Sequence, residues 1–160
     1  MEWVMTELLR YPDQLRRAVD ELDAIIGGPN IVEEFRLPRL LYLEAVVKET
    51  LRIHPPAPLL MPHISSETIV VAGYTIPKNS NIFFNAWAIQ RDTEFWEDPL
   101  QFELERFLNV IEKRNYKENS FDFFPVWIGE EDLCWGFNGR ENYDVGVGDI
   151  VALFRMGIAE

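Results

Sequence analysis

The sequence predicts a mainly α-helical domain with a small β-sheet, an α+β fold class. Three segments, residues 1–11, 12–26 and 40–54, place apolar residues three and four positions apart, which is the spacing of an amphipathic helix. Two short apolar runs, residues 69–71 and 74–76, stand close enough together to form a β-hairpin. The chain has 160 residues, of which 48% are hydrophobic. This is enough to bury one core and argues against disorder.

The first two predicted helices meet at a proline. Pro12 and Asp13 suit the start of the second helix, because proline fits the first helical position and a carboxylate favours the positive end of the helix dipole. Gly27-Gly28 ends it. Its apolar stripe consists of Leu15, Ala18, Val19, Leu22, Ile25 and Ile26. Its charged residues are expected to form a solvent-exposed face, made of Arg16, Arg17, Asp20, Glu21 and Asp23.

The third predicted helix is the segment around which the chain is organised. Its apolar stripe, which can face a core, consists of Leu40, Leu43, Val47 and Leu51. Glu49 and Arg52 lie three residues apart on one side, and Pro55-Pro56 stops the helix just beyond them. One interpretation of this pair is an exposed ion pair worth about 0.3 kcal/mol. The other is a buried pair with a structural role.

A small sheet is expected after the third helix. The strands at 69–71 and 74–76 flank Ala72-Gly73, which supplies the hairpin turn. Residues 77–80 form a second turn, and residues 81–85 form a third short strand.

The segment 48–56, KETLRIHPP, resembles the K-helix signature of the cytochrome P450 family, the haem-thiolate monooxygenases, and is most similar to plant microsomal members. Residues 102–107 resemble the PERF segment of that family, with Leu104 in place of the proline. The resemblance implies a structural triad of Glu49, Arg52 and Arg106, which in the family holds the meander behind the haem. Arginine suits this role because its planar fork can meet a carboxylate twice.

The matching segments follow the family order and belong to the C-terminal part of its catalytic domain. Residues 1–11 resemble the end of the I helix, residues 12–26 the J helix, and residues 86–92 the K′ helix. We therefore expect residues 1–160 to form a single partial P450 domain: the end of I, the J and K helices, the small β-sheet, the meander and a degenerate haem loop. Microsomal relatives are anchored in the endoplasmic reticulum by an N-terminal helix, so we expect a cytosolic location if this chain is expressed alone.

The resemblance implies haem as the cofactor and Cys134 as its iron ligand. Counted from Pro125, this cysteine arrives one residue later than in relatives, and the acidic residues 130–132 oppose a thiolate. The alternative for Cys134 is a buried free cysteine. His63 stands where many relatives carry an arginine that pairs with a haem propionate. A histidine can do this only when protonated, and the alternative is a loop histidine that faces water.

Charge and composition exclude several other classes of function. The formal net charge of −12, with no basic stripe, argues against nucleic acid and anionic lipid as partners. One cysteine and two histidines argue against an intrachain disulfide and a zinc cluster. No apolar run reaches the length of about 18 residues needed to span a membrane.

Two functions remain open. In the first, the chain is part of a monooxygenase that oxidises small apolar metabolites with molecular oxygen, the apolar loop 57–62 touches the substrate, and an NADPH-dependent reductase supplies electrons. In the second, it is a non-catalytic remnant or an acidic interaction module that binds no haem. Residues 130–149 contain six carboxylates and one arginine, whereas relatives present a basic face to their reductase. The oxygen-activating segment of the family lies upstream of Met1, so we expect no autonomous activity from these 160 residues.

Overall fold

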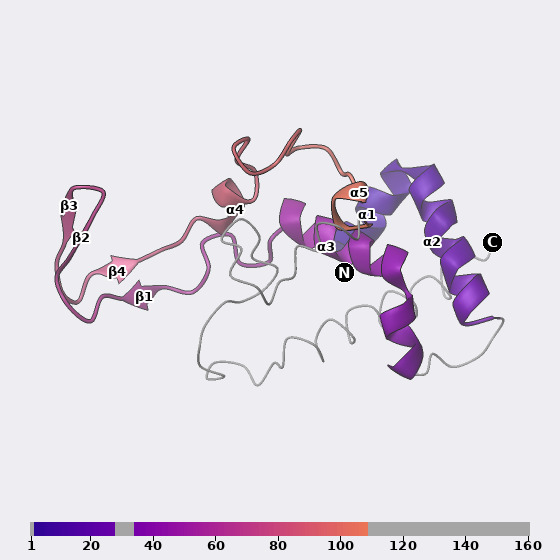
Figure 1. Cartoon of the computed structure of the whole chain (residues 1–160), viewed down its shortest axis with the longest axis horizontal. Helices are drawn as coiled ribbons and strands as arrows, with labels where there is room; N and C mark the ends of the chain where they lie inside the picture. Colours follow the sequence, from indigo (N-terminus) through magenta and orange to yellow (C-terminus); the bar gives the residue numbers. More distant parts are fainter. Residues whose placement is uncertain (1, 28–33, 109–160) are drawn as a thin grey trace.

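The computed structural model describes residues 2–27 and 34–108, and it is mainly helical with small sheets. Figure 1 shows a body of helices from which an extended pair of β-segments projects. In chain order the elements are α1 (Glu2–Arg10), α2 (Pro12–Ile25), the 3₁₀ helix η1 (Glu34–Arg39), α3 (Leu41–Ile53), β1 (His63–Ile64), β2 (Ile69–Val71), β3 (Tyr74–Ile76), β4 (Asn81–Ile82), α4 (Ala86–Ile89) and α5 (Glu105–Leu108).

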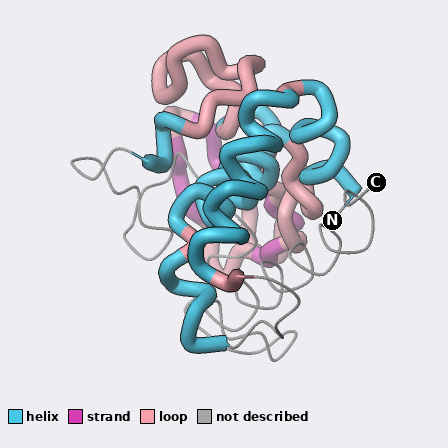
Figure 2. The backbone as a smooth tube through the Cα atoms, turned by 90° about the vertical axis from the view of Figure 1, so that its right-hand side faces the viewer, coloured by secondary structure: helices cyan, strands magenta, loops and turns pink. Residues whose placement is uncertain are grey.

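The core lies where α1, α2 and α3 pack against one another, with α5 against α3. In Figure 2 the helices lie together in front of the strands. The predicted stripe of α2 is confirmed, since Ala18, Leu22 and Ile26 are buried and the rest of the stripe packs against the core. Burial of these apolar side chains, rather than helix propensity, stabilises helices of this length.

Helix α3 is buried more completely than its apolar stripe predicts. Its buried residues are Tyr42, Leu43, Ala45, Val46, Val47, Glu49, Thr50, Arg52 and Ile53. The reason is that α1, α2 and α5 all contact α3, so no face of α3 is fully exposed to solvent. Because some of these buried residues are polar or charged, apolar spacing alone does not reveal them.

The strands form two separate two-stranded antiparallel sheets, β1–β4 and β2–β3, instead of one small sheet. The hairpin is confirmed, and Ala72 and Gly73 both have positive φ, of 50° and 83°. This is the turn geometry that matches the twist of a tight hairpin. The third predicted strand is shorter than expected, since β4 ends at Ile82, and β1 was not predicted.

The predicted exposed face of α2 is wrong for Glu21, which is half-buried. The backbone amides of Tyr42 and Leu43 donate to its carboxylate oxygens at 2.8 and 2.9 Å. Glu21 therefore satisfies amides at the start of α3, which have no partner within that helix. Arg17 is exposed as predicted, yet it also contacts α3, because its guanidinium lies 4.6 Å from the centre of the Tyr42 ring.

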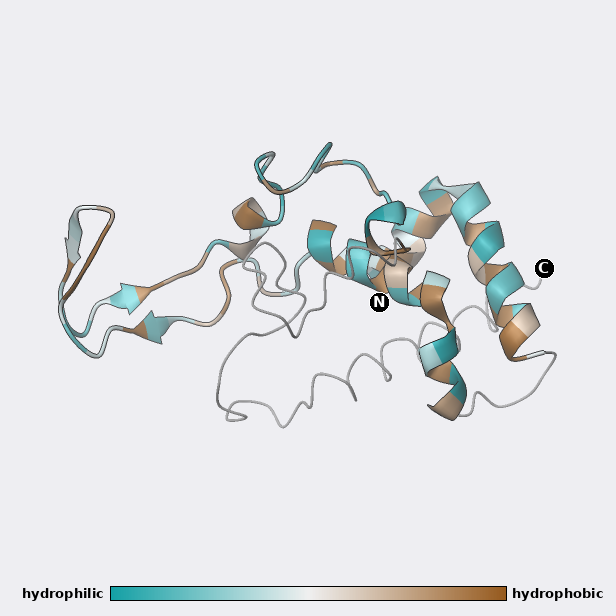
Figure 3. Ribbon diagram, viewed as in Figure 1, coloured by the Kyte–Doolittle hydropathy of each residue, from teal (hydrophilic) through white to brown (hydrophobic). Residues whose placement is uncertain are grey.

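Hydropathy follows this architecture. Figure 3 shows hydrophobic and hydrophilic residues interleaved along the helices of the body, and hydrophobic stretches beside β2 and β4. No helix among the described residues combines the length and apolar character needed to cross a bilayer.

Candidate functional site

A buried ion pair on α3 is the centre of the candidate site. Arg52 Nε lies 2.7 Å from Glu49 Oε2, and Arg52 Nη2 lies 2.7 Å from Glu49 Oε1. Both side chains have no exposed area. The helical spacing i,i+3 places them on one face, and the two parallel contacts are the bidentate geometry expected of arginine and carboxylate. The interpretation of this pair as an exposed ion pair is therefore wrong.

The other N–H groups of Arg52 hold the segment between α4 and α5. Nη1 donates to the carbonyl oxygens of Gln90 (2.9 Å) and Pro99 (2.7 Å), and Nη2 donates to that of Gln101 (3.1 Å). Together with Glu49 these acceptors use all five N–H groups of the guanidinium. One buried side chain thus fixes three backbone positions of a segment that has little regular structure.

Arg106 joins the pair less tightly. Its Nε lies 3.7 Å from Glu49 Oε1, a distance that allows charge attraction but no hydrogen bond. Its Nη2 makes closer contacts, with the Glu103 carboxylate at 2.9 Å and the Asp98 carbonyl at 3.1 Å. The structure therefore brings Glu49, Arg52 and Arg106 together. Their shared role in holding a haem-binding segment stays a prediction.

Glu49 reaches the PERF-like segment through the backbone as well. The amide N–H of Glu103 donates to Glu49 Oε1 at 3.0 Å. Leu104, which stands where the family has proline, is buried in the core. Leu104 thus replaces the proline ring of the family with an apolar side chain that packs in the core.

Two further groups of the same segment contact α3. The buried Trp96 ring lies 5.0 Å from the guanidinium carbon of Arg52, a cation–π arrangement. Arg91 donates to the carbonyl of Ile53 at the end of α3 and to that of Trp87. Burial, together with the nearby charge of Arg52, lowers the pKa of Arg91 from its usual value. Arg91 thus satisfies a carbonyl that the last turn of a helix leaves open.

A cluster that the sequence did not predict connects α1 to the end of α3. His54 Nε2 lies 2.9 Å from Glu7 Oε1, and the His54 ring stacks on Trp3 with centroids 4.1 Å apart. Arg10 Nη1 is 3.4 Å from both oxygens of Glu7, whose side chain is 4% exposed. Glu7 and His54 are 47 residues apart in the chain, so no local pattern could have paired them.

The predicted haem contacts are only partly within the described residues. His63 lies on β1, is exposed, and meets the Phe84 ring edge-on at 5.5 Å. This exposure agrees both with a propionate contact and with a histidine that faces water, so the role of His63 stays a prediction. Cys134 and the whole loop around it lie outside the described residues. Residues 2–27 and 34–108 contain no group of three or more His, Cys, Asp or Glu that could hold a metal ion.

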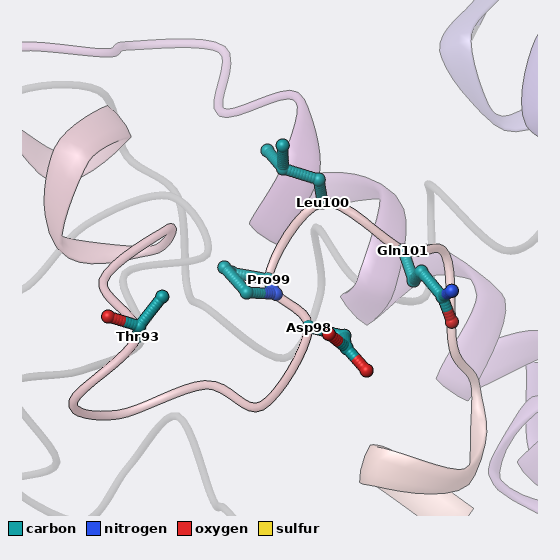
Figure 4. A pocket seen from close by; sticks show the side chains of 5 residues that line it. All are labelled: Thr93, Asp98, Pro99, Leu100 and Gln101. Carbon is teal, nitrogen blue, oxygen red and sulfur yellow. The ribbon is translucent and has the colours of Figure 1, made fainter.

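A cavity of about 260 Å³ lies on the segment between α4 and α5. Figure 4 shows its five lining side chains spread along the loop rather than converging on one point. They are Thr93, Asp98, Pro99, Leu100 and Gln101. Asp98 is the only ionisable group among them, so the cavity lacks the convergent polar groups of a ligand site.

Comparison with known proteins agrees with this geometry. The family model described as Cytochrome P450 matches residues 1–125, and the chain belongs to the cytochrome P450 family. It is 44% identical over 140 residues to a flavonoid 3'-monooxygenase of Crocosmia x crocosmiiflora, covering 86% of this chain and 27% of that protein. It is 45% identical over 137 residues to an iridoid oxidase of Catharanthus roseus, covering 86% of this chain and 26% of that protein. The resemblance to plant members is thus confirmed.

Solved structures support the same fold. A zebra fish cytochrome P450 solved with progesterone superposes with a TM-score of 0.76 at 29% identity, covering 94% of this chain and 32% of that one. The chain therefore spans about a quarter of the length of the curated relatives it matches and about a third of the solved one.

Proposed function

We propose that this chain is the part of a cytochrome P450 monooxygenase domain that lies behind and beside the haem, in an enzyme that oxidises small apolar metabolites with molecular oxygen. The observation that carries the proposal is the Arg52–Glu49 pair, which is fully buried and bonded to three carbonyls between α4 and α5. In this proposal residues 1–160 form a single partial domain, and Glu49, Arg52 and Arg106 fix the backbone that leads into the cysteine loop.

The cofactor of this function is haem, which would supply the oxidising chemistry when bound. Cys134 would be its iron ligand, and His63 would donate to a propionate. The residues of the described part do not react in this proposal. They hold the polypeptide on which the ligand is presented, which is the positioning role that a rigid supporting shell has in a cofactor site.

The substrate side would be formed by the loop after α3. Leu59 and Met61 are 48% and 44% exposed, respectively, on a segment stiffened by prolines. Exposed apolar side chains on a stiff loop suit contact with an apolar small molecule. Electrons would come from an NADPH-dependent reductase.

The test is a carbon monoxide difference spectrum of the reduced protein after reconstitution with haem. A Soret shift typical of thiolate ligation is expected, and Cys134→Ser should abolish it. The matched control is Thr6→Ala, an exposed position without a role in the proposal, which should keep the shift. Absence of specific haem uptake would leave the alternative, a non-catalytic remnant or an acidic interaction module that binds no haem.

A further inference from the structure

His54 connects helix α1 to the start of the loop that the proposed function places beside the substrate. Its backbone amide caps α3 by donating to the Thr50 carbonyl at 2.7 Å. Its ring stacks on Trp3 with an angle of 8° between the ring planes, and Nε2 lies 2.9 Å from the Glu7 carboxylate. Only two prolines separate His54 from the loop 57–62. The loop therefore begins next to a residue that is bound to α1.

Glu7 is a firm anchor for this contact because its carboxylate is buried. Its side chain is 4% exposed, and the largely exposed Arg10 approaches both carboxylate oxygens only to 3.4 Å. The contact with the His54 ring is the shorter one, at 2.9 Å. A buried carboxylate that loses a hydrogen-bond donor stays desolvated without compensation. The folded chain therefore favours the position of His54 in which its ring meets Glu7.

Pro55 and Pro56 carry the position of His54 into the loop. A proline ring fixes φ at about −65° and also restricts the conformation of the residue before it, so the backbone after His54 has few alternatives. The Leu60 amide then donates to the Ala57 carbonyl at 3.0 Å, which closes a turn. Movement of the His54 backbone would therefore move the turn 57–60 as well.

The same turn is held by α4 and contains a strained residue. The amide of Trp87 donates to the Pro58 carbonyl at 3.1 Å. Leu60 has a φ of 51°, in the left-handed region that leucine seldom adopts. Such a conformation persists only where the surrounding structure holds it. Leu60 stands between Leu59 and Met61, the exposed side chains that the proposed function places at the substrate.

We propose that His54 is a positioning residue, which through its contact with Glu7 holds the turn 57–60 in the conformation that presents Leu59 and Met61. The inference deepens the proposed function and rests on it for the presence of a substrate there. The holding itself requires neither haem nor substrate. Because His54 is bound to α1, the two apolar side chains keep one position relative to the helical body.

The test is amide hydrogen exchange, measured by NMR on the whole chain without haem. His54→Ala and Glu7→Ala should each speed exchange of the Leu60 and Trp87 amides about fivefold or more, because the turn and its anchor then open more often. The amide of Ile26, bonded at the end of α2, should change by less than about twofold. These rates do not depend on cofactor, so their outcome is independent of the carbon monoxide test.

Three variants separate positioning from a general loss of stability. His54→Gln keeps a side-chain N–H donor and should return both amides to within about twofold of the parent rates. Glu21→Ala removes a carboxylate at the opposite end of α3 and should leave both amides unchanged. Trp3→Ala, at a residue 54% exposed, removes only the stacking partner and should speed both amides, which tests the proposal even if His54→Ala does not fold.

Three results would overturn the proposal. The first is parent-like exchange of the Leu60 and Trp87 amides when His54 or Trp3 is replaced by alanine. The second is exchange in His54→Gln as fast as in His54→Ala. The third is an equal acceleration in Glu21→Ala, which would mean that the turn responds to overall stability and not to its contact with α1.

Discussion

Arg52 and Glu49 form a fully buried bidentate ion pair in which every N–H of the guanidinium has an acceptor. A pair of this kind adds little stability by its presence, because its attraction is offset by the desolvation of two charges. Removing one partner has a much larger effect. The other charge then stays buried without compensation, and, if the arginine is the one removed, three carbonyls lose their donor.

Arg52→Ala is therefore expected to destabilise the fold by about 3 kcal/mol or more. The measurement is urea-induced unfolding followed by circular dichroism. The control is Arg16→Ala, since Arg16 forms an ion pair with Asp13 at 3.8 Å in which both side chains are exposed. That variant should change the free energy of unfolding by less than about 0.5 kcal/mol. Equal effects of the two variants would show that the buried pair is not assembled in solution.

The sequence predicted those features whose signal is local. The α2 stripe and the Ala72-Gly73 hairpin follow from spacing and turn chemistry within a few residues, and Pro55-Pro56 limits α3 in the same way. The triad residues were singled out through family resemblance, because an ExxR spacing by itself is compatible with an exposed pair. The structure added that Arg52 also bonds three carbonyls, of Gln90, Pro99 and Gln101.

The features that were not predicted depend on contacts between distant segments. In the sequence Glu21 looks like any charged residue on an exposed helix face, because its partner Tyr42, in the first turn of α3, lies 21 residues later. His54 belongs to a family motif, yet its partner Glu7 lies on another helix. The separation of the sheet into two pairs likewise depends on which strand β4 meets, and it meets β1 rather than β3. Periodicity cannot report such pairings, because they are tertiary.

Glu21→Ala tests the unexpected cap of α3. Removing the carboxylate leaves the amides of Tyr42 and Leu43 without their acceptor, and loss of an N-terminal cap costs about 1 kcal/mol. The measurement is the urea midpoint. Asp23→Ala is the control, since it removes a charge from an exposed position of the same helix. If both variants shift the midpoint equally, the effect is one of net charge and the cap contributes nothing.

The contact between His54 and Glu7 is tested by a double-mutant cycle. His54→Ala and Glu7→Ala each remove one partner of a part-buried hydrogen bond, so the double variant should be less destabilised than the sum of the single variants, by about 1 kcal/mol. Thr6→Ala combined with Glu7→Ala serves as the control cycle, because the exposed Thr6 hydroxyl donates to the carbonyl of Glu2 and not to Glu7. Additive effects of His54→Ala and Glu7→Ala would contradict the contact.

Tyr42 predicts how stability falls at alkaline pH. Burial raises the pKa of its phenol above the usual 10.0, with Arg17 opposing the shift and Glu105 and Glu21 adding to it. The folded state therefore holds the phenol proton more tightly than the unfolded state does. The stability that the protonated Tyr42 contributes is fully present below pH 10.0 and is lost as the pH rises through the folded-state pKa. Tyr42→Phe should therefore unfold with a weaker pH dependence than the parent chain between about pH 9 and about pH 11.

The same substitution should be nearly neutral at pH 7. The Tyr42 hydroxyl is buried and has no hydrogen-bond partner among the described residues, so phenylalanine loses no bond that the structure shows there. The ring itself, and with it the contact to the Arg17 guanidinium, is kept. Urea unfolding at several pH values gives both quantities, and Tyr74→Phe, at a residue 78% exposed, is the control. If the free energy of unfolding of Tyr42→Phe fell with alkaline pH as steeply as that of the parent chain, the Tyr42 phenol would not be the source of this pH dependence.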